Sequence, residues 1–294
     1  MHKREIHPHH DPVRAYERAR AELKKSRKLQ NTIFLILFLG ALTASVVIGE
    51  VRLGNFVEGI PSFLNYFSDI TPQIRADSIV SDVREWYWGL GTWLKLLVDT
   101  ILIAYLGTLL GTIGAFVFCF PASRNLMRNT TIYFVCRRLM EFCRAVPELV
   151  FALIFVFSFG IGPFPGVLAI ALHSTGALGK LFSEVNENLD PRPLEGVRAA
   201  GGNWFQILRL AVIPQVLPNF LSYTLLRFEI NVRAASVIGF VGAGGIGQEL
   251  MFVIREFIYT DISAIVLLII FTVSAIDILC EQARHKLIGR EGLL

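Results

Sequence analysis

A polar, helix-forming segment reads Glu195-Gly-Val-Arg-Ala-Ala-Gly201-Gly-Asn-Trp-Phe-Gln-Ile-Leu-Arg-Leu-Ala-Val-Ile-Pro214 and stands between long apolar runs. A segment of this kind must lie outside the lipid, because its neighbours are suited to the bilayer core. We predict a short helix from Leu194, with Glu195 near its amino end, where a carboxylate suits the helix dipole. The Gly201-Gly pair breaks that helix, and a second helix, 204–212, leads into the membrane at Pro214. Together the two helices and the bend, residues 194–212, form a projection, here called the knob, that could fit into a groove on a partner protein.

The composition identifies a membrane protein. Of 294 residues, 53% are apolar and only 18% are charged, a balance far from that of soluble domains. The four cysteines have no paired spacing, and the four histidines within residues 2–10 lack the acids or cysteines that would complete a metal site. We therefore predict no disulfide framework, no metal site and no cofactor.

Six apolar runs predict an all-α, polytopic protein with about six transmembrane helices. They cover residues 32–49, 96–120, 146–162, 164–182, 214–236 and 262–280. The Gly-Pro-Phe-Pro-Gly sequence at 162–166 predicts a tight hairpin between the third and fourth runs. In the second run, Gly107, Gly111 and Gly114 are spaced to let another helix approach closely, although glycines are also simply common in membrane helices.

The distribution of basic residues predicts the orientation. With six spans, the amino terminus, the 121–144 connection, the 183–213 connection and the carboxyl terminus lie on one side. They carry nine, five, three and three Lys or Arg residues, whereas the opposite side carries three in its long loop, none in the hairpin and one in its last loop. By the positive-inside rule, the first set is cytoplasmic.

The quoted segment resembles the coupling loop of bacterial ABC importer permeases, whose pattern is Glu-Ala-Ala, three residues, Gly, nine residues and Ile-x-Leu-Pro. Glu195, Gly201 and Pro214 fall in register with it. The departures are small or apolar: Gly196 and Val197 replace the two alanines, and Ala211 and Ile213 replace Ile and Leu. The resemblance implies that Glu195 and Gly201 couple the spans to a separate ATPase.

A wider resemblance covers residues 90–290. The segments 214–236, 237–247 and 144–148 are similar to the phosphonate and phosphite ABC transporter permease family. This resemblance implies a type I ABC importer permease fold, as in methionine importers, in the bacterial inner membrane. It also implies a second copy of the chain, two cytosolic ATP-binding subunits and a periplasmic phosphonate-binding protein as partners.

These inferences divide the chain into five parts. Residues 1–31 are expected to form a basic cytoplasmic segment, 32–49 the first transmembrane helix and 50–94 a periplasmic loop. Residues 95–283 form the core permease domain with the coupling loop at 183–213, and 284–294 form a cytoplasmic tail.

Charged residues inside the fifth span are candidates for the translocation pathway. Arg227, Glu229 and Arg233 lie more than halfway along it, where an uncompensated charge costs about 3 kcal/mol or more. Glu229 and Arg233 are four residues apart and suit an ion pair. Arg227 is then left with spare donors for a phosphonate or phosphite oxygen. An internal salt-bridge set that fixes packing, or a position near enough to the interface to snorkel, is the competing interpretation.

Further candidates for the pathway or a gate come from the family signature and from polar patches. Asn231 and Ser236 stand in the signature. Arg144 ends the preceding polar connection, and Glu148 lies at the start of the third span, where it could belong to an inner gate or instead cap a helix. His173 belongs to a polar patch in the fourth span, where an interhelical hydrogen bond is the commoner outcome. The Gly-x-Gly-x-x-Gly string at 242–247 follows a membrane span rather than a strand, so it indicates tight backbone bends, not a dinucleotide site.

The sequence carries no Walker A string, histidine-carboxylate cluster or nucleophile elbow, so we predict a transport subunit and not an enzyme. No nucleic-acid partner is expected. Two alternatives remain open: a permease for methionine or another amino acid, and a membrane-embedded lipid-modifying enzyme with Arg227, Glu229 and His173 as its polar centre.

Overall fold

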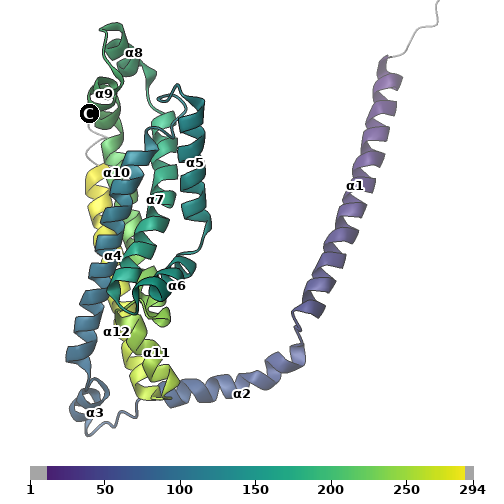
Figure 1. Cartoon of the computed structure of the whole chain (residues 1–294). Helices are drawn as coiled ribbons and strands as arrows, with labels where there is room; N and C mark the ends of the chain where they lie inside the picture. The colour runs from purple at the N-terminus through teal and green to yellow at the C-terminus, as the bar shows by residue number, and fades with distance from the viewer. Residues whose placement is uncertain (1–11, 289–294) are drawn as a thin grey trace, which may run out of the picture. The chain divides into compact units, whose positions relative to one another are not determined.

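The structure, a computed structural model, describes residues 12–288, and all its regular elements in that range are helices (Figure 1). The amino-terminal histidines and Arg290 lie outside the described residues. The chain forms two compact units, one ending at Phe67 and one starting at Ser68.

The first unit contains helix α1 (Pro12–Ile48) and nearly all of α2 (Leu53–Ile70). The charged segment and the first apolar run are therefore one continuous helix. A hydrogen-bonded cap ends it: the Val51 N–H donates to the Val46 carbonyl at 3.0 Å, and Glu50 adopts a φ of 51°. Helix α2 follows at once, inside the segment expected to be a loop. Its apolar side chains recur every three or four residues and form one face.

The second unit is a helical bundle. Its helices are α3 (Ile79–Trp86), α4 (Leu90–Cys119), α5 (Thr130–Ala145), α6 (Glu148–Phe159), α7 (Pro163–Glu187), α8 (Pro191–Ala199), α9 (Trp204–Ile207), α10 (Ile213–Ile238), α11 (Ile246–Arg255) and α12 (Tyr259–Ile288), with a π turn η1 (Leu208–Val212) and a 3-10 turn η2 (Gly239–Val241). Helices α4, α7 and α10 pack together as its centre.

Glycines on α4 allow α7 to lie close, as their spacing predicts. A Cβ atom at Gly107 would stand 2.6 Å from Ile170 Cγ2, and one at Gly111 would stand 2.6 Å from Ser174 Cβ. At Gly114 the obstacle is Thr175, whose Oγ1 would be 2.6 Å away. This close approach brings the polar patch of α7 against the middle of α4.

Three expectations about the connections require correction. The turn between the third and fourth apolar runs lies at 160–162, where Gly160 has a φ of 89°, and Pro163 already begins α7. Proline suits the first turn of a helix because its missing N–H has no partner there. The polar 121–144 connection contains α5, which packs on α7, and the connection between the last two apolar runs contains α11.

Among the described helices, α1, α4 and α12 are long and apolar enough to cross a membrane. The count rises to five if two bent pairs each form one span: α5 with α6, bent by 87°, and the α9–η2 stretch with α11, bent by 45°. Helix α7 is not among them, and its sequence includes the polar patch 173–175 and Lys180.

Candidate functional site

The predicted knob consists of α8 and α9. Asp190 caps α8 by accepting a hydrogen bond from the Arg192 N–H at 3.0 Å, and prolines fill the first turn. At the other end, the Gly201 N–H donates to the Arg198 carbonyl at 3.0 Å and the Gly202 N–H donates to the Val197 carbonyl at 2.9 Å. This is the Schellman pattern. Gly201 has a φ of 81°, a conformation that side chains disfavour.

The second half of the knob begins directly after Gly202. Asn203 and Gln206 form a reciprocal capping box that begins α9. Helix, glycine bend and helix are thus present, but α8 begins at Pro191 and not at Leu194. Glu195 is therefore in the middle of α8 and exposed to solvent, not near the amino end as expected, and the carboxylate at that end is Asp190.

Buried apolar contacts fix the knob to the bundle. Leu194 and Ile207 belong to a core cluster with Phe182 and Phe220, whose rings stack with centroids 3.9 Å apart. The Trp204 indole N–H also donates to the Leu126 carbonyl at 3.1 Å. Force on α8 and α9 would therefore reach α7, α10 and the α4–α5 connection.

No break separates the knob from α10. The π turn η1 joins α9 to α10, and Pro214 lies in the first turn of α10. Proline removes one backbone donor, and a π turn immediately before it is one way to re-route the helical hydrogen bonds. The Gln215 side chain helps by donating to the Ala211 carbonyl at 2.6 Å. The second helix of the knob is thus mechanically continuous with the span that carries Arg227.

Figure 1 shows α8 and α9 at the same end of the bundle as the carboxyl end of α12, with α3 at the opposite end. The candidates Arg227, Glu148 and His173 meet between these ends, where α10, α6 and α7 pack together. Arg227 Nη2 lies 3.4 Å from Glu148 Oε2, and His173 Nε2 lies 3.7 Å from the same oxygen. All three side chains line a cleft of about 350 Å³.

Asn231 continues this polar layer into the core. It is fully buried, and its amide nitrogen donates to Thr108 Oγ1 at 2.8 Å and to Ser174 Oγ at 2.9 Å. The Arg227 Nε–H donates to the same Ser174 hydroxyl at 3.1 Å. Arg227 is therefore anchored from two sides, and the expectation that it has spare donors holds only for the part of the guanidinium that faces the cleft.

The predicted Glu229–Arg233 ion pair is confirmed, with Arg233 Nη2 2.8 Å from Glu229 Oε1. Two residues of α12 join it. Arg284 Nη2 lies 3.3 Å from Glu229 Oε2, and Arg233 Nη1 lies 3.7 Å from Asp277 Oδ2. These contacts hold α10 against α12, so this second cluster of charges joins two helices of the bundle.

Two candidates lie apart from both clusters. The Ser236 hydroxyl donates to the Val232 carbonyl at 3.3 Å within α10. Arg144 is exposed near the end of α5, beside Gly176, where a Cβ atom would stand 2.6 Å from the Arg144 backbone nitrogen. Arg144 therefore marks a close contact of α5 with α7.

The candidate set omitted Thr108, Ser174, Asp277 and Arg284. Ser174 was visible in the polar patch next to His173. Thr108 was hidden beside the glycines of the second run, and Asp277 and Arg284 lie in the last apolar run and its basic end. No local pattern connects residues on α4, α7 and α12 with α10, because only the packing of distant helices brings them together.

Residues 106–284 match the family described as binding-protein-dependent transport system inner membrane component. The chain is 37% identical to the phosphite transport system permease protein PtxC of Stutzerimonas stutzeri, over 82% of this chain and 84% of that one. It is 42% identical to the phosphate-import permease protein PhnE of Mycolicibacterium smegmatis, over 66% of this chain but only 36% of that longer protein.

Solved structures agree on the fold. The MetNI methionine ABC transporter, in inward-facing conformations, matches with a TM-score of 0.58 at 17% identity, covering 66% of this chain and 95% of the matched chain. A bacterial ABC transporter that imports the polysaccharide alginate matches with a TM-score of 0.57 at 11% identity, covering 90% and 99%. These identities show the architecture alone.

Proposed function

Because this chain belongs to the family of binding-protein-dependent transport system inner membrane components, we propose that it carries a phosphorus oxyanion, phosphonate or phosphite, across the membrane. The chain is the permease subunit of an ABC importer and a multi-pass inner-membrane protein. Members of this family work with ATP-binding subunits that hydrolyse ATP and with a substrate-binding protein. Our proposal concerns the substrate, the residues that bind it and the residues that couple its transport to ATP hydrolysis.

The substrate proposal is supported by two independent observations. Relatives at 37% and 42% identity are named for phosphite and phosphate import. In addition, Arg227 presents part of its guanidinium to a cleft of about 350 Å³ within the bundle. A guanidinium suits phosphorus oxyanions because its paired N–H groups match two oxygens at once.

For coupling, we propose that the knob of α8 and α9 faces the cytoplasm and docks on an ATP-binding subunit. The exposed Glu195 and the Schellman glycine Gly201 shape its outer surface. Movement of the knob is transmitted through the continuous α9–η1–α10 helix to Arg227. In this scheme both termini are cytoplasmic, residues 183–213 form the coupling loop and 50–94 are periplasmic.

We further propose that two copies of the chain form the pathway. Helix α6, which contributes Glu148 and Leu149 to the cleft beside Arg227, carries several exposed large apolar side chains, of which Phe157 is 88% exposed. Exposed apolar surface of this extent marks either lipid or a protein contact. A pairing of two copies would close the cleft.

The proposal can be tested with the permease, its ATP-binding subunits and its loaded binding protein in proteoliposomes. We expect ATP-dependent uptake of methylphosphonate or phosphite that stops when the ATP-binding subunits are omitted. Uptake of methionine instead would identify an amino-acid permease. Turnover of a lipid without the ATP-binding subunits would identify the enzyme alternative.

A further inference from the structure

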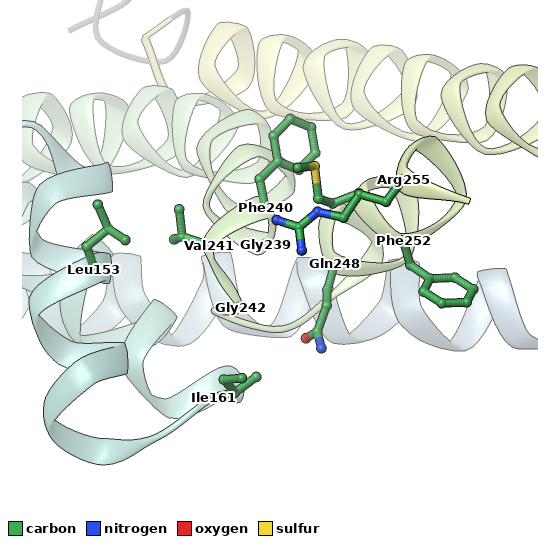
Figure 2. A pocket seen from close by; sticks show the side chains of 10 residues that line it. Leu153, Ile161, Gly239, Phe240, Val241, Gly242, Gln248, Phe252 and Arg255 are labelled. Atoms are coloured by element: carbon green, nitrogen blue, oxygen red, sulfur yellow. The ribbon is translucent and has the colours of Figure 1, made fainter. Parts of the chain in front are cut away.

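A second cleft, distinct from the one beside Arg227, lies where α6, η2 and α11 meet (Figure 2). Its volume is about 500 Å³. The floor is glycine backbone at 239 and 242, and apolar side chains such as Leu153, Phe240 and Phe252 form the walls. Two polar side chains enter it, Gln248 and Arg255, and none of the described residues that line it is acidic.

Both polar groups are available to a ligand. Among the described residues, none forms an ion pair or a side-chain hydrogen bond with Arg255, and the Gln248 side chain likewise has no such partner. Figure 2 shows the Arg255 side chain running back along α11 toward η2, while the Gln248 amide points to the side of Gly242 and Ile161. Arg227, by contrast, is already held by Glu148 and Ser174.

The geometry points to an anion-binding station: we propose that Arg255 and Gln248 bind the substrate oxyanion in this cleft before it reaches Arg227. This inference rests on the proposed function and assigns it a second site. A guanidinium and an amide offer several N–H donors to phosphorus-bound oxygens. The apolar walls can contact the carbon substituent of a phosphonate, whereas an all-polar site would offer that substituent no apolar contact.

The two clefts are consecutive along the same helices. Leu149 lines the cleft of Arg227, and Leu153, one helical turn further along α6, lines the cleft of Arg255. On the facing segment, Ile238 lines the first and Gly239 lines the second. Figure 1 places α11 toward the end of the bundle that carries α3, away from α8 and α9. An anion entering from that end would therefore meet Arg255 first.

A simpler role for Arg255 is to stabilise the carboxyl end of α11, because a cation in the last turn suits the helix dipole. That role needs the charge near the terminal carbonyls. The side chain instead extends toward the amino end of its own helix and lies over the cleft. The two roles also respond differently to substitution, since lysine keeps the dipole interaction but loses the paired N–H groups.

The test compares R255Q, R255K and Q248A with wild type in proteoliposomes that contain the ATP-binding subunits and saturating loaded binding protein. Initial uptake of methylphosphonate and of phosphite is the readout. We expect R255Q to lower uptake of both anions about tenfold or more, the typical effect of losing a charge-assisted hydrogen bond. R255K should lower it by a smaller factor, and Q248A by a few-fold.

The matched control is R84Q, which removes an exposed arginine from α3, at the same end of the bundle but outside the cleft. It should leave uptake unchanged. Co-purification of R255Q with the ATP-binding subunits checks that the variant folds. If R255Q supports uptake within twofold of wild type, or falls no further than R84Q, the station does not exist. If wild type itself takes up neither anion, the proposed function fails and not this inference alone.

Discussion

Arg227 of α10 and Glu148 of α6 form an ion pair across the bundle, with Arg227 Nη2 3.4 Å from Glu148 Oε2. Their side chains are 12% and 26% exposed, so little solvent screens the pair. Glu148 occupies part of the guanidinium that would otherwise be free for substrate. In the proposed pathway, a passing oxyanion would compete with this carboxylate for the Arg227 guanidinium.

We predict that R227Q impairs uptake of the phosphorus oxyanion and destabilises the bundle, because it leaves Glu148 without its strongest partner. The pair is only partly buried, so the loss of stability should be smaller than the roughly 3–5 kcal/mol that breaking a fully buried pair costs. The double variant E148Q/R227Q removes both charges and should recover most of that stability but not the uptake. Thermal unfolding and proteoliposome uptake, measured side by side, separate the two effects. Recovery of uptake in the double variant would reduce Arg227 to a packing residue.

At the knob, we predict that G201A weakens coupling without disturbing the core. Gly201 has a φ of 81°, and a Cβ atom there would meet no neighbour within 4 Å. The penalty is therefore one of backbone conformation, roughly 1–2 kcal/mol. The Schellman turn should loosen, and ATP-driven uptake should fall several-fold while the membrane helices remain folded.

Gly196 provides the matched control. It also has open space around its Cβ position, but it lies inside α8 with ordinary helical backbone. G196A should therefore strengthen α8 by about 1 kcal/mol and leave uptake intact. Equal uptake by G201A and G196A would show that the bend at Gly201 has no part in coupling.

Glu195 is exposed, so its role can be tested with little effect on stability. We predict that E195Q lowers affinity for the ATP-binding subunits, because the lost carboxylate would face the partner and not the core. Co-purification and ATP-driven uptake are the measurements. E85Q is the control, since Glu85 is an exposed acid on α3, at the end of the bundle opposite to α8 and α9. Retained association and uptake in E195Q would contradict the docking surface.

Local patterns determine much of this architecture. The apolar runs locate α1, α4 and α12, and the Gly-Gly pair locates the bend between α8 and α9. Hydrophobicity could not reveal α2, α5 or α11, because amphipathic and charged helices leave no long apolar run. For the same reason α7 extends past the predicted span, which ends at residue 182, as far as Glu187.

The candidate site was partly predictable for a different reason. A charge inside an apolar run stands out, so Arg227, Glu229 and Arg233 could be identified without a fold. Their partners could not, with the exception of Arg233, which lies one helical turn from Glu229. Glu148 lies 79 residues from Arg227 along the chain, and a pairing at that separation depends on how α6 and α10 pack. Sequence spacing alone therefore overestimates the number of free N–H donors on Arg227.

The last prediction concerns the segment that precedes α3. Asp82, in the first turn of α3, forms hydrogen bonds with residues of this segment. Its carboxylate accepts hydrogen bonds from the Arg75 N–H at 2.8 Å, from Arg75 Nη2 at 3.2 Å and from the Ser78 hydroxyl at 3.0 Å. These bonds, the Arg75 backbone N–H first, hold the pKa of Asp82 below its ordinary value. The carboxylate thus stays ionised in mildly acidic solution.

Because the folded-state pKa of Asp82 is lowered, its ionised carboxylate stabilises this turn fully at every pH above the ordinary carboxyl pKa, which is about 3.9. This stabilisation is lost only as the pH falls through the lowered pKa. We therefore expect the Arg75 amide to stay protected from hydrogen exchange at both pH 6.5 and about pH 4.5, after correction for the intrinsic exchange rate. D82N should remove the protection at both values, because its neutral side chain cannot accept the same set of bonds as strongly. The exposed Asp77, for which the structure gives no such set of bonds, supplies the control variant D77N. Loss of protection in wild type by pH 4.5 would contradict the assignment, since it would place the titration of Asp82 at or above the ordinary carboxyl range.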